Sequence, residues 1–384
     1  RIGMEIYFDN SATTQPFECA RQAVLACMTE AYYNPSALYA PAVKVSKILA
    51  ETRVAFAREM RVKEEEIIFT SGGTESNVDA ILGAVPPRRA KAHVITDLTE
   101  HSSVYETFRH LEQYGAEVTL LRPNRQGEIT PEALQAAMRP DTRLVSVMQV
   151  NNETGAVNDI EALSKTAKLI APHCIFHCDG VQAFPKLRFP GGLVDAYSVS
   201  GHKFHAPRGT GVLYLKNGSG IQPVMVGGGQ EHGYRAGTEN MAGIAGLGAA
   251  LKQYTQNRDG YVQRMREVKQ ALYSQLIRIP GAHLNGPGIE QGAPHILSMS
   301  FEGTRGETLV HALEEQKIYV GTGSACSSHK KGVSRTLSAM EIPPQIAQGT
   351  LRFSFSCMNT VEQANIVARA VEQSVARVRR FVRR

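Results

Sequence analysis

The sequence is poor in the features that mark membrane, secreted and highly charged proteins. No apolar run among its 384 residues is long enough to cross a bilayer. The first residues, 1–8, lack the apolar stretch of a secretory signal, and Met4 is a candidate natural start. The six cysteines are sparse and show no disulfide-scaffold spacing. We therefore expect a protein of a reducing, cytoplasmic setting that contacts no membrane.

The chain also has little excess of positive over negative charge, since its formal net charge is only +6. Five arginines lie within residues 377–384, so the rest of the chain is nearly neutral. Such cations suit the C-terminal end of a helix, whose dipole favours positive charge. RNA or an acidic partner at this end is the alternative. We expect no direct contact with nucleic acid.

Apolar runs alternate with helical patterns from about residue 50 to residue 215. This alternation predicts an α/β fold, with a mostly parallel sheet covered by helices on both faces. In such sheets, ligands bind beyond the carboxyl ends of the strands. The seven candidate strands are residues 66–70, 93–96, 117–121, 144–150, 175–179, 196–199 and 211–215.

The pattern changes in the last third of the chain. Apolar residues between Val262 and Leu276 recur at three- and four-residue spacing, which predicts a long amphipathic helix. Short strands and further helices follow it. We expect a large domain over residues 15–255 and a smaller α+β domain formed by residues 1–14 and 256–384.

Two residues that follow predicted strands suggest a cofactor. Lys203 lies in a turn of small residues between two apolar runs, which favours burial, a lowered pKa and a usable amine. Asp179 ends another apolar run and precedes Gly180. A lysine that forms a Schiff base and a carboxylate that pairs with a pyridine nitrogen are the chemical signature of a pyridoxal 5'-phosphate (PLP) enzyme. Taken singly, Lys203 fits a solvated cation and Asp179 fits a turn residue.

The segment Thr70-Ser-Gly-Gly-Thr74 joins a strand to a helix. Glycines let the backbone approach an anion, and free N–H groups at a helix start bind it. Gly73 and Thr74 therefore form a candidate phosphate site. A tight turn with a threonine cap is the alternative.

Histidines offer two further possibilities. His101 follows another strand, where its ring can stack on an aromatic cofactor or transfer a proton, although a hydrogen-bonded surface histidine is the simpler alternative. His173, Cys174, His177 and Cys178 suggest a metal site. Strand alternation places the two histidines on one face and the two cysteines on the other, so we expect no metal.

Two candidate residues lie near the C-terminal end. Cys326 lies in a loop of small and polar residues from Gly321 to Gly332, which leaves a thiol accessible. Neighbouring cations such as Lys330 favour the thiolate. Arg352 interrupts an apolar strand, where it can hold a carboxylate in a bidentate fork. An incidental free cysteine and an edge-strand arginine are the alternatives.

Taken together, these residues resemble the cysteine desulfurases, which are fold-type I PLP enzymes of the class-V aminotransferase family. The resemblance runs from Tyr7 to about Asn359. Its most specific motifs are Ser200-Gly-His-Lys-Phe-His-Ala-Pro207, Arg235-Ala-Gly-Thr-Glu-Asn240 and Gly323-Ser-Ala-Cys-Ser-Ser328. The last of these is similar to the motif of the long-loop class, which includes the nitrogen-fixation and housekeeping iron–sulfur enzymes.

The resemblance implies how PLP is bound. Lys203 carries the cofactor and moves protons, Asp179 pairs with the ring nitrogen, and Gln182 contacts the ring hydroxyl. His101 stacks on the ring and assists proton transfer. The remaining cofactor-binding residues are Gly73, Thr74, Asn152, Ser200, His202 and Thr238. Thr238 reaches the phosphate of the partner subunit, which implies a homodimer.

The resemblance also implies the chemistry. Asn152 and Arg352 anchor the carboxylate of L-cysteine, and Cys326 takes its sulfur as a persulfide, leaving alanine. The sulfur then passes to an acceptor protein, either an iron–sulfur scaffold or a sulfur carrier, for iron–sulfur cluster assembly or thiolation. A selenocysteine lyase or a small-substrate aminotransferase of the same fold is the alternative, although an aminotransferase needs no thiol. A catalytically silent interaction protein is disfavoured by the intact set of Lys203, Asp179 and His101.

Overall fold

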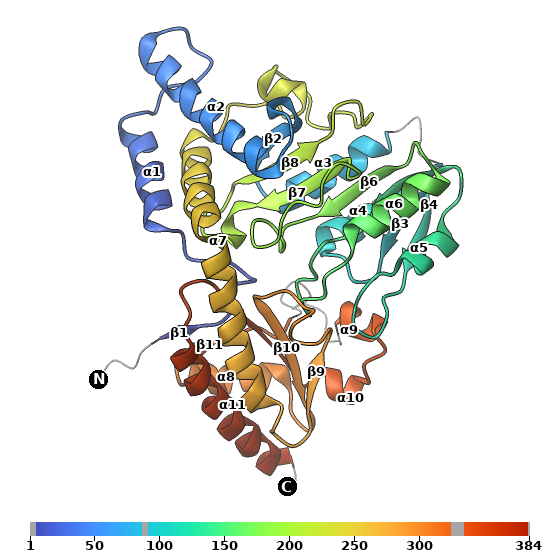
Figure 1. Ribbon diagram of the computed structural model, residues 1–384, viewed down its shortest axis with the longest axis vertical. Coiled ribbons are helices and arrows are strands. Elements are labelled where there is room, and N and C mark those ends of the chain that lie inside the picture. Colours follow the sequence, from blue (N-terminus) through green and yellow to red (C-terminus); the bar gives the residue numbers. More distant parts are fainter. Residues whose placement is uncertain (1–4, 87–90, 324–333, 383–384) are drawn as a thin grey trace.

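The computed structural model describes residues 5–86, 91–323 and 334–382, and its larger part is built on a seven-stranded sheet (Figure 1). The strands are β2 (Ile67–Thr70), β3 (His93–Asp97), β4 (Glu117–Leu121), β5 (Thr142–Ser146), β6 (Ile175–Asp179), β7 (Ala196–Ser200) and β8 (Gly211–Leu215). Their order is β2-β8-β7-β6-β5-β3-β4. Neighbours are parallel, except that β8 is antiparallel to both β2 and β7. The predicted α/β fold with a mostly parallel sheet is confirmed.

The predicted strand over residues 144–150 differs most from the structure, whereas three others differ by one residue at one end. Strand β5 ends at Ser146, whereas the apolar run continues to Val150. The ladder with β6 nevertheless goes on, because Val147 and Gln149 donate backbone hydrogen bonds to the carbonyl oxygens of His177 and Asp179. This extension beyond β5 fixes the position of Asp179 at the carboxyl end of the sheet.

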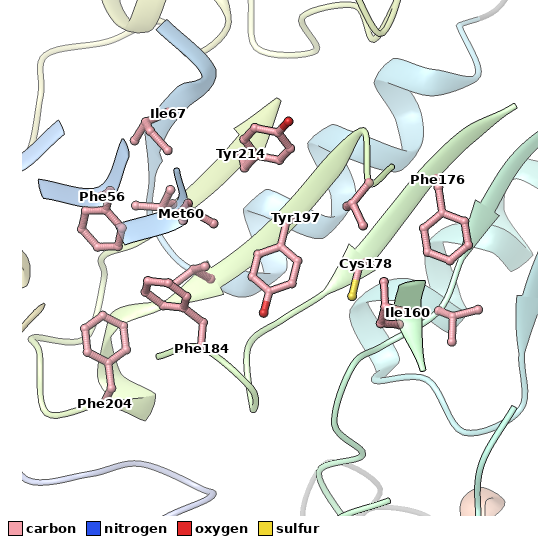
Figure 2. Close-up of a cluster of buried hydrophobic side chains, with 14 of the residues drawn as sticks. Phe56, Met60, Ile67, Ile160, Phe176, Cys178, Phe184, Tyr197, Phe204 and Tyr214 are labelled. Carbon is pink, nitrogen blue, oxygen red and sulfur yellow. The ribbon is translucent and has the colours of Figure 1, made fainter. Parts of the chain in front are cut away.

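Helices cover both faces of the sheet. Along β6, Phe176 belongs to one buried cluster and Ile175 to another on the opposite face, as strand alternation requires. Figure 2 shows the first cluster, which includes Phe184, Tyr197 and Phe204. Two helices cover the Ile175 face, α3 (Gly73–Ala84) and α4 (Ser102–Gln113). The Phe176 face is covered by α2 (Ala40–Met60), α5 (Pro131–Ala137), α6 (Ile160–Ile170) and part of α7 (Met241–Leu276).

The smaller part has its own buried core and two small sheets. Strands β9 (Ala282–Asn285), β10 (Ile296–Phe301) and β12 (Thr350–Ser354) form an antiparallel sheet in the order β12-β10-β9. The N-terminal strand β1 (Ile6–Tyr7) pairs in parallel with β11 (Ile318–Tyr319). The helices of the whole molecule not yet named are α1 (Glu18–Thr29), α8 (Gly306–Glu314), α9 (Arg335–Ala339), α10 (Pro344–Ala347) and α11 (Val361–Val382). Three 3-10 turns also occur, η1 (Glu64–Glu66), η3 (Gly201–Lys203) and η4 (Gln230–Gly233).

Helix α7 joins the two parts and runs past both cores (Figure 1). Its Leu247 is buried in the core of the large sheet, and its Leu272 is buried in the core of the smaller part. Residue 255, where the sequence places the domain boundary, thus lies inside one continuous helix. The two-domain division itself stays a prediction. None of the helices in the described ranges has the length and apolar character needed to span a membrane.

Candidate active site

The candidate residues gather where strands of the large sheet end. Asp179 is the last residue of β6 and Ser200 is the last residue of β7. Lys203 closes the 3-10 turn that follows β7, and His101 precedes α4 after β3. Strands β3, β5, β6 and β7 run in the same direction, so their carboxyl ends meet at one edge of the sheet.

Lys203 and Gln182 approach each other at the N-terminal segment. The Lys203 amine donates hydrogen bonds to the backbone oxygens of Ser11, over 2.6 Å, and Ala12, over 2.9 Å. The Gln182 amide donates to the same Ser11 oxygen over 2.9 Å. On its other side, the Gln182 oxygen lies 3.2 Å from a ring nitrogen of the buried His295. Sequence reasoning missed Ser11 and His295, because Ser11 lies 192 residues from Lys203 along the chain and no spacing signals such a contact.

Asp179 belongs to a chain of hydrogen bonds that ends at His101. One carboxylate oxygen of the buried Asp179 accepts from the backbone N–H of Val181, over 2.9 Å, and the other from Asn77, over 2.8 Å. Asn77 also donates to the Ser103 hydroxyl over 2.9 Å, and that hydroxyl lies 2.8 Å from the His101 ring. These bonds fix the orientation of the carboxylate and of the imidazole. Sequence reasoning missed Asn77, which looks like an ordinary polar residue of α3.

The start of α3 forms a close-fitting cradle. A Cβ atom at Gly73 would come within 2.5 Å of a methyl carbon of Val181 and 3.5 Å of the Ser200 Cβ. Only glycine therefore lets the helix start lie against the ends of β6 and β7. No side chain caps the helix at Gly72 among the described residues, so the threonine-cap alternative is wrong. The first N–H groups of α3 suit an anion. Thr74 is exposed beside them.

His202 and Thr238 lie in different surroundings. A ring nitrogen of His202 lies 3.1 Å from the Thr13 hydroxyl. Burial, with the nearby charges of Lys203 and Arg208, lowers the pKa of His202 to about 4, so the ring is neutral at neutral pH. Thr238 is exposed in the segment before α7, and the described contacts of this single chain do not join it to the other candidates.

Arg352 and Asn152 are brought together, at the boundary with the smaller part. Arg352 is 4% exposed. Its guanidinium donates to the backbone oxygen of Asn152 over 2.9 Å and pairs with Asp9 over 3.0 Å. Its Nε is buried and has no hydrogen-bond partner within the described ranges. A buried donor without an acceptor indicates a place for a ligand oxygen.

Cys326 lies outside the described residues. The residues on either side of its segment both approach Glu153. The Ser334 hydroxyl donates to a Glu153 carboxylate oxygen, and a Cβ atom at Gly323 would lie 3.7 Å from that same oxygen. Glu153 follows Asn152 directly, so both flanks of the Cys326 segment lie next to the Arg352 site.

Two buried carboxyl groups adjoin the site and were missed. Asp97 accepts from the Thr99 hydroxyl over 2.5 Å, and Glu100 accepts from the backbone N–H of Met148 over 2.6 Å. Burial raises the pKa of the Glu100 carboxyl well above its usual range, and the charges of Asp97 and Asp179 raise it further. The surroundings of Glu100 therefore favour its protonated form. Its position next to His101 in the sequence was the only available signal.

Of the four His and Cys residues at positions 173–178, His173 is exposed and the other three are buried. His177 is buried between the hydroxyls of Ser146 and Ser198, 2.7 and 2.9 Å away, and burial lowers its pKa to about 3. Cys174 and Cys178 lie in the core on the other side, where burial raises their thiol pKa. The described part of the chain contains no group of three or more His, Cys, Asp or Glu placed to hold a metal ion.

Known proteins resemble this chain over nearly its whole length. The profile "Aminotransferase class-V" matches residues 6–367. A "NifS/IcsS protein homolog" of Lactobacillus delbrueckii subsp. bulgaricus is 43% identical, covering 94% of each chain. "Cysteine desulfurase IscS" of Dictyoglomus turgidum is 36% identical, covering 98% of this chain and 95% of that protein. A solved "NIFS-like protein" has a TM-score of 0.90 at 33% identity, covering 97% of this chain and 100% of its own.

Proposed function

The chain belongs to the class-V aminotransferase family, and on that premise we propose that it is a PLP-dependent cysteine desulfurase that converts L-cysteine to L-alanine and transferable sulfur. The observation that carries the proposal is the meeting of Lys203 and Gln182 at one backbone oxygen, beside the buried Asp179. An amine and a carboxylate at adjacent strand ends are what a pyridoxal ring requires.

The described residues fit PLP part by part. The Lys203 amine faces the site and can bind the aldehyde. Asp179, held by Asn77 and Val181, can pair with the ring nitrogen. His101 can lie against the ring, because its own ring is anchored to Ser103. When bound, PLP draws electrons from the Cα of the substrate and so loosens the bond between Cβ and sulfur.

The phosphate would lie at the start of α3. The Gly73 cradle brings the helix N-terminus to the buried Ser200 hydroxyl, and the exposed Thr74 can complete the ring of donors. A neutral His202 is free to donate or accept one hydrogen bond without adding charge. Thr238 would serve the phosphate site of a second copy of the chain.

Arg352 and Asn152 would hold the substrate carboxylate. The unpartnered Nε of Arg352 offers one donor at once, and the Nη2 held by Asp9 offers a second if the substrate replaces Asp9. Two parallel N–H groups match the two oxygens of a carboxylate. This would place the amine and thiol ends of L-cysteine toward Lys203 and the Cys326 segment.

Cys326 would take the sulfur. Its thiolate attacks the substrate sulfur, forming an S–S bond while the Cβ–S bond breaks. The carbon keeps the bonding pair and gains a proton, which gives alanine and a Cys326 persulfide. The support is the position of Gly323 and Ser334, which bring both flanks of the segment to Glu153. The persulfide would then pass to an acceptor protein, either an iron–sulfur scaffold or a sulfur carrier.

A homodimer in the cytoplasm is the setting that we propose. Met225 forms a β-bridge with Arg235, three residues before Thr238, and the apolar strip Val224–Val226 is exposed, with Val226 80% accessible. A second copy covering this strip would bury apolar surface and bring Thr238 to the neighbouring site. The five described cysteines are free, as expected in a reducing compartment.

The test is an assay of purified protein with L-cysteine, measuring alanine and protein-bound persulfide. We expect alanine formation, and Cys326→Ala should lower it by about 100-fold or more while the yellow colour of bound PLP persists. Cys19→Ala is the matched control, because Cys19 lies on α1 and bonds only to Gln253 and Ala249 among the described residues. Equal alanine release by wild type and Cys326→Ala would contradict the thiol role. L-selenocysteine, assayed in parallel, tests the lyase alternative.

A further inference from the structure

A second lysine, Lys186, lies buried against the turn over residues 201–203, which contains Lys203. Lys186 is 7% exposed, and its amine donates a hydrogen bond to the backbone oxygen of Lys203 over 3.0 Å. Phe184 and Phe204 are buried next to this turn, and the centroids of their rings lie 6.0 Å apart in the core shown in Figure 2. A lysine amine rarely lies in such a place unless a carboxylate balances its charge.

No carboxylate within the described ranges pairs with Lys186. The ionisable groups that face it are Lys203 and His202 of the turn, together with His205, Cys357 and His295. All three histidines are neutral at neutral pH, because burial lowers the pKa of each. Cys357, which lies 3.7 Å from the His205 ring, has a thiol pKa raised by burial to about 11. A charged Lys186 therefore faces neutral groups and one other amine.

The two lysines influence each other's protonation. Burial lowers the pKa of Lys186 to about 7, and the charge of Lys203 is the next cause. Coulomb repulsion is reciprocal, so a charge on Lys186 opposes a charge on Lys203 by the same free energy. A second cation is one of the known ways to keep a Schiff-base lysine in its neutral, nucleophilic form.

We propose that Lys186 is a positioning residue for Lys203: it holds the 201–203 turn through the carbonyl bond and disfavours a proton on the Lys203 nitrogen. This inference rests on the proposed function, in which Lys203 carries PLP. The hydrogen bond of Lys186 is to the backbone oxygen of Lys203, so Lys186 acts through Lys203 and not on the reacting atoms. Loss of the Lys186 charge would leave the Lys203 nitrogen protonated up to a higher pH.

The experiment is a pH titration of the visible absorbance of the PLP-loaded protein, which reports the proton on the nitrogen that joins Lys203 to the cofactor. Lys186→Met should raise the midpoint by about one pH unit, because a neighbouring cation is removed. Lys186→Arg keeps a positive charge at every pH, so its midpoint should lie at or below that of wild type.

Lys269→Met is the matched control. Lys269 is 3% exposed, donates to the backbone oxygen of Ala293 over 2.8 Å, and has a pKa that burial lowers to about 7, but it lies on α7 and makes no described bond to Lys203. Its removal should leave the midpoint in place. A purely structural role for Lys186 would lower the melting temperature of Lys186→Met without moving the midpoint.

The outcomes separate the two proposals. Wild-type protein that develops no PLP absorbance contradicts the proposed function itself. Wild-type protein with normal absorbance, and a midpoint unchanged in Lys186→Met, overturns the role of Lys186 alone. If Lys269→Met shifts the midpoint as much as Lys186→Met does, the role of Lys186 is overturned as well. If Lys186→Met does not fold, Lys186→Arg decides, since a midpoint that rises in that variant contradicts the inference.

Discussion

Lys203 and Gln182 donate hydrogen bonds to one acceptor, the backbone oxygen of Ser11, over 2.6 and 2.9 Å. Lys203 belongs to the turn after β7, and Gln182 belongs to the turn after β6. The shared oxygen therefore ties two adjacent strand ends of the large sheet to the N-terminal segment. That segment pairs with β11 through Ile6–Tyr7, so the site forms where the two parts of the molecule meet.

Asn77 links Asp179 to the His101 side of the site, and its removal tests that link. Asn77→Ala leaves one Asp179 oxygen without its donor. Loss of a hydrogen bond to a charged group costs about 1.5–3 kcal/mol, so we expect PLP to bind about 10-fold or more weakly. Equilibrium dialysis of the apo protein against PLP measures this. Asn124→Ala, in the turn over residues 124–128, is the control, and equal affinities in the two variants would contradict the link.

Gly73 should tolerate no side chain beside Val181. Gly73→Ala places a Cβ atom 2.5 Å from a Val181 methyl carbon and should move the start of α3 away from Ser200. We expect PLP to dissociate about 10-fold faster. The double variant with Val181→Ala removes the clashing methyl groups and should recover most of the loss. If the second change brings no recovery, the close fit is not the cause.

Arg352 is expected to act on substrate affinity. Arg352→Lys removes the planar fork, so KM for L-cysteine should rise about 10-fold or more while PLP absorbance is unchanged. Asp9→Asn weakens the ion pair that competes for the guanidinium and should leave KM equal or lower. Steady-state kinetics on both variants checks the pair. A higher KM in Asp9→Asn, or a loss of kcat alone in Arg352→Lys, would count against carboxylate binding.

Buried histidines should make the apo protein acid-sensitive. Burial lowers the pKa of His177 to about 3 and those of His202 and His205 to about 4. Below the usual pKa of about 6.5, the unfolded chain binds protons that the folded chain does not, so stability falls as pH falls, by up to about 1.4 kcal/mol per pH unit for each histidine. The loss continues down to the folded pKa values.

Urea unfolding between about pH 7.5 and about pH 4.5 measures that slope. His205→Gln should make the free energy of unfolding depend less steeply on pH, by about one proton. The exposed His110→Gln is the control. A slope that is the same in both variants would show that His205 takes up its proton in the folded state.

The sequence predicts local features of this protein well and distant contacts poorly. Strands β4, β6 and β8 coincide with their apolar runs, because alternation and turn residues act over a few positions. Asp179 and Lys203 stand out for the same reason, since each follows a strand. Asn77 does not, because its partner Asp179 is 102 residues away and only the folded sheet joins them.

Burial is the second property that the sequence hides. Lys186 and Glu100 look like surface residues in the sequence, yet the structure buries both at the site. Their altered proton affinities come from the surrounding core, which the order of residues does not reveal. The position of the domain boundary is hidden in the same way. Helix α7 continues through residue 255 without a break, and its buried residues belong first to the core of the large sheet and then to the core of the smaller part.

The central claim, that Lys203 is the residue that carries PLP, can be tested by chemical trapping. Borohydride reduction of the PLP-loaded protein fixes the cofactor to its lysine, and mass spectrometry of the digested protein then identifies that residue. We predict the label on the peptide that contains Lys203. A label on Lys186, the neighbouring buried amine, or on any other lysine would contradict the account.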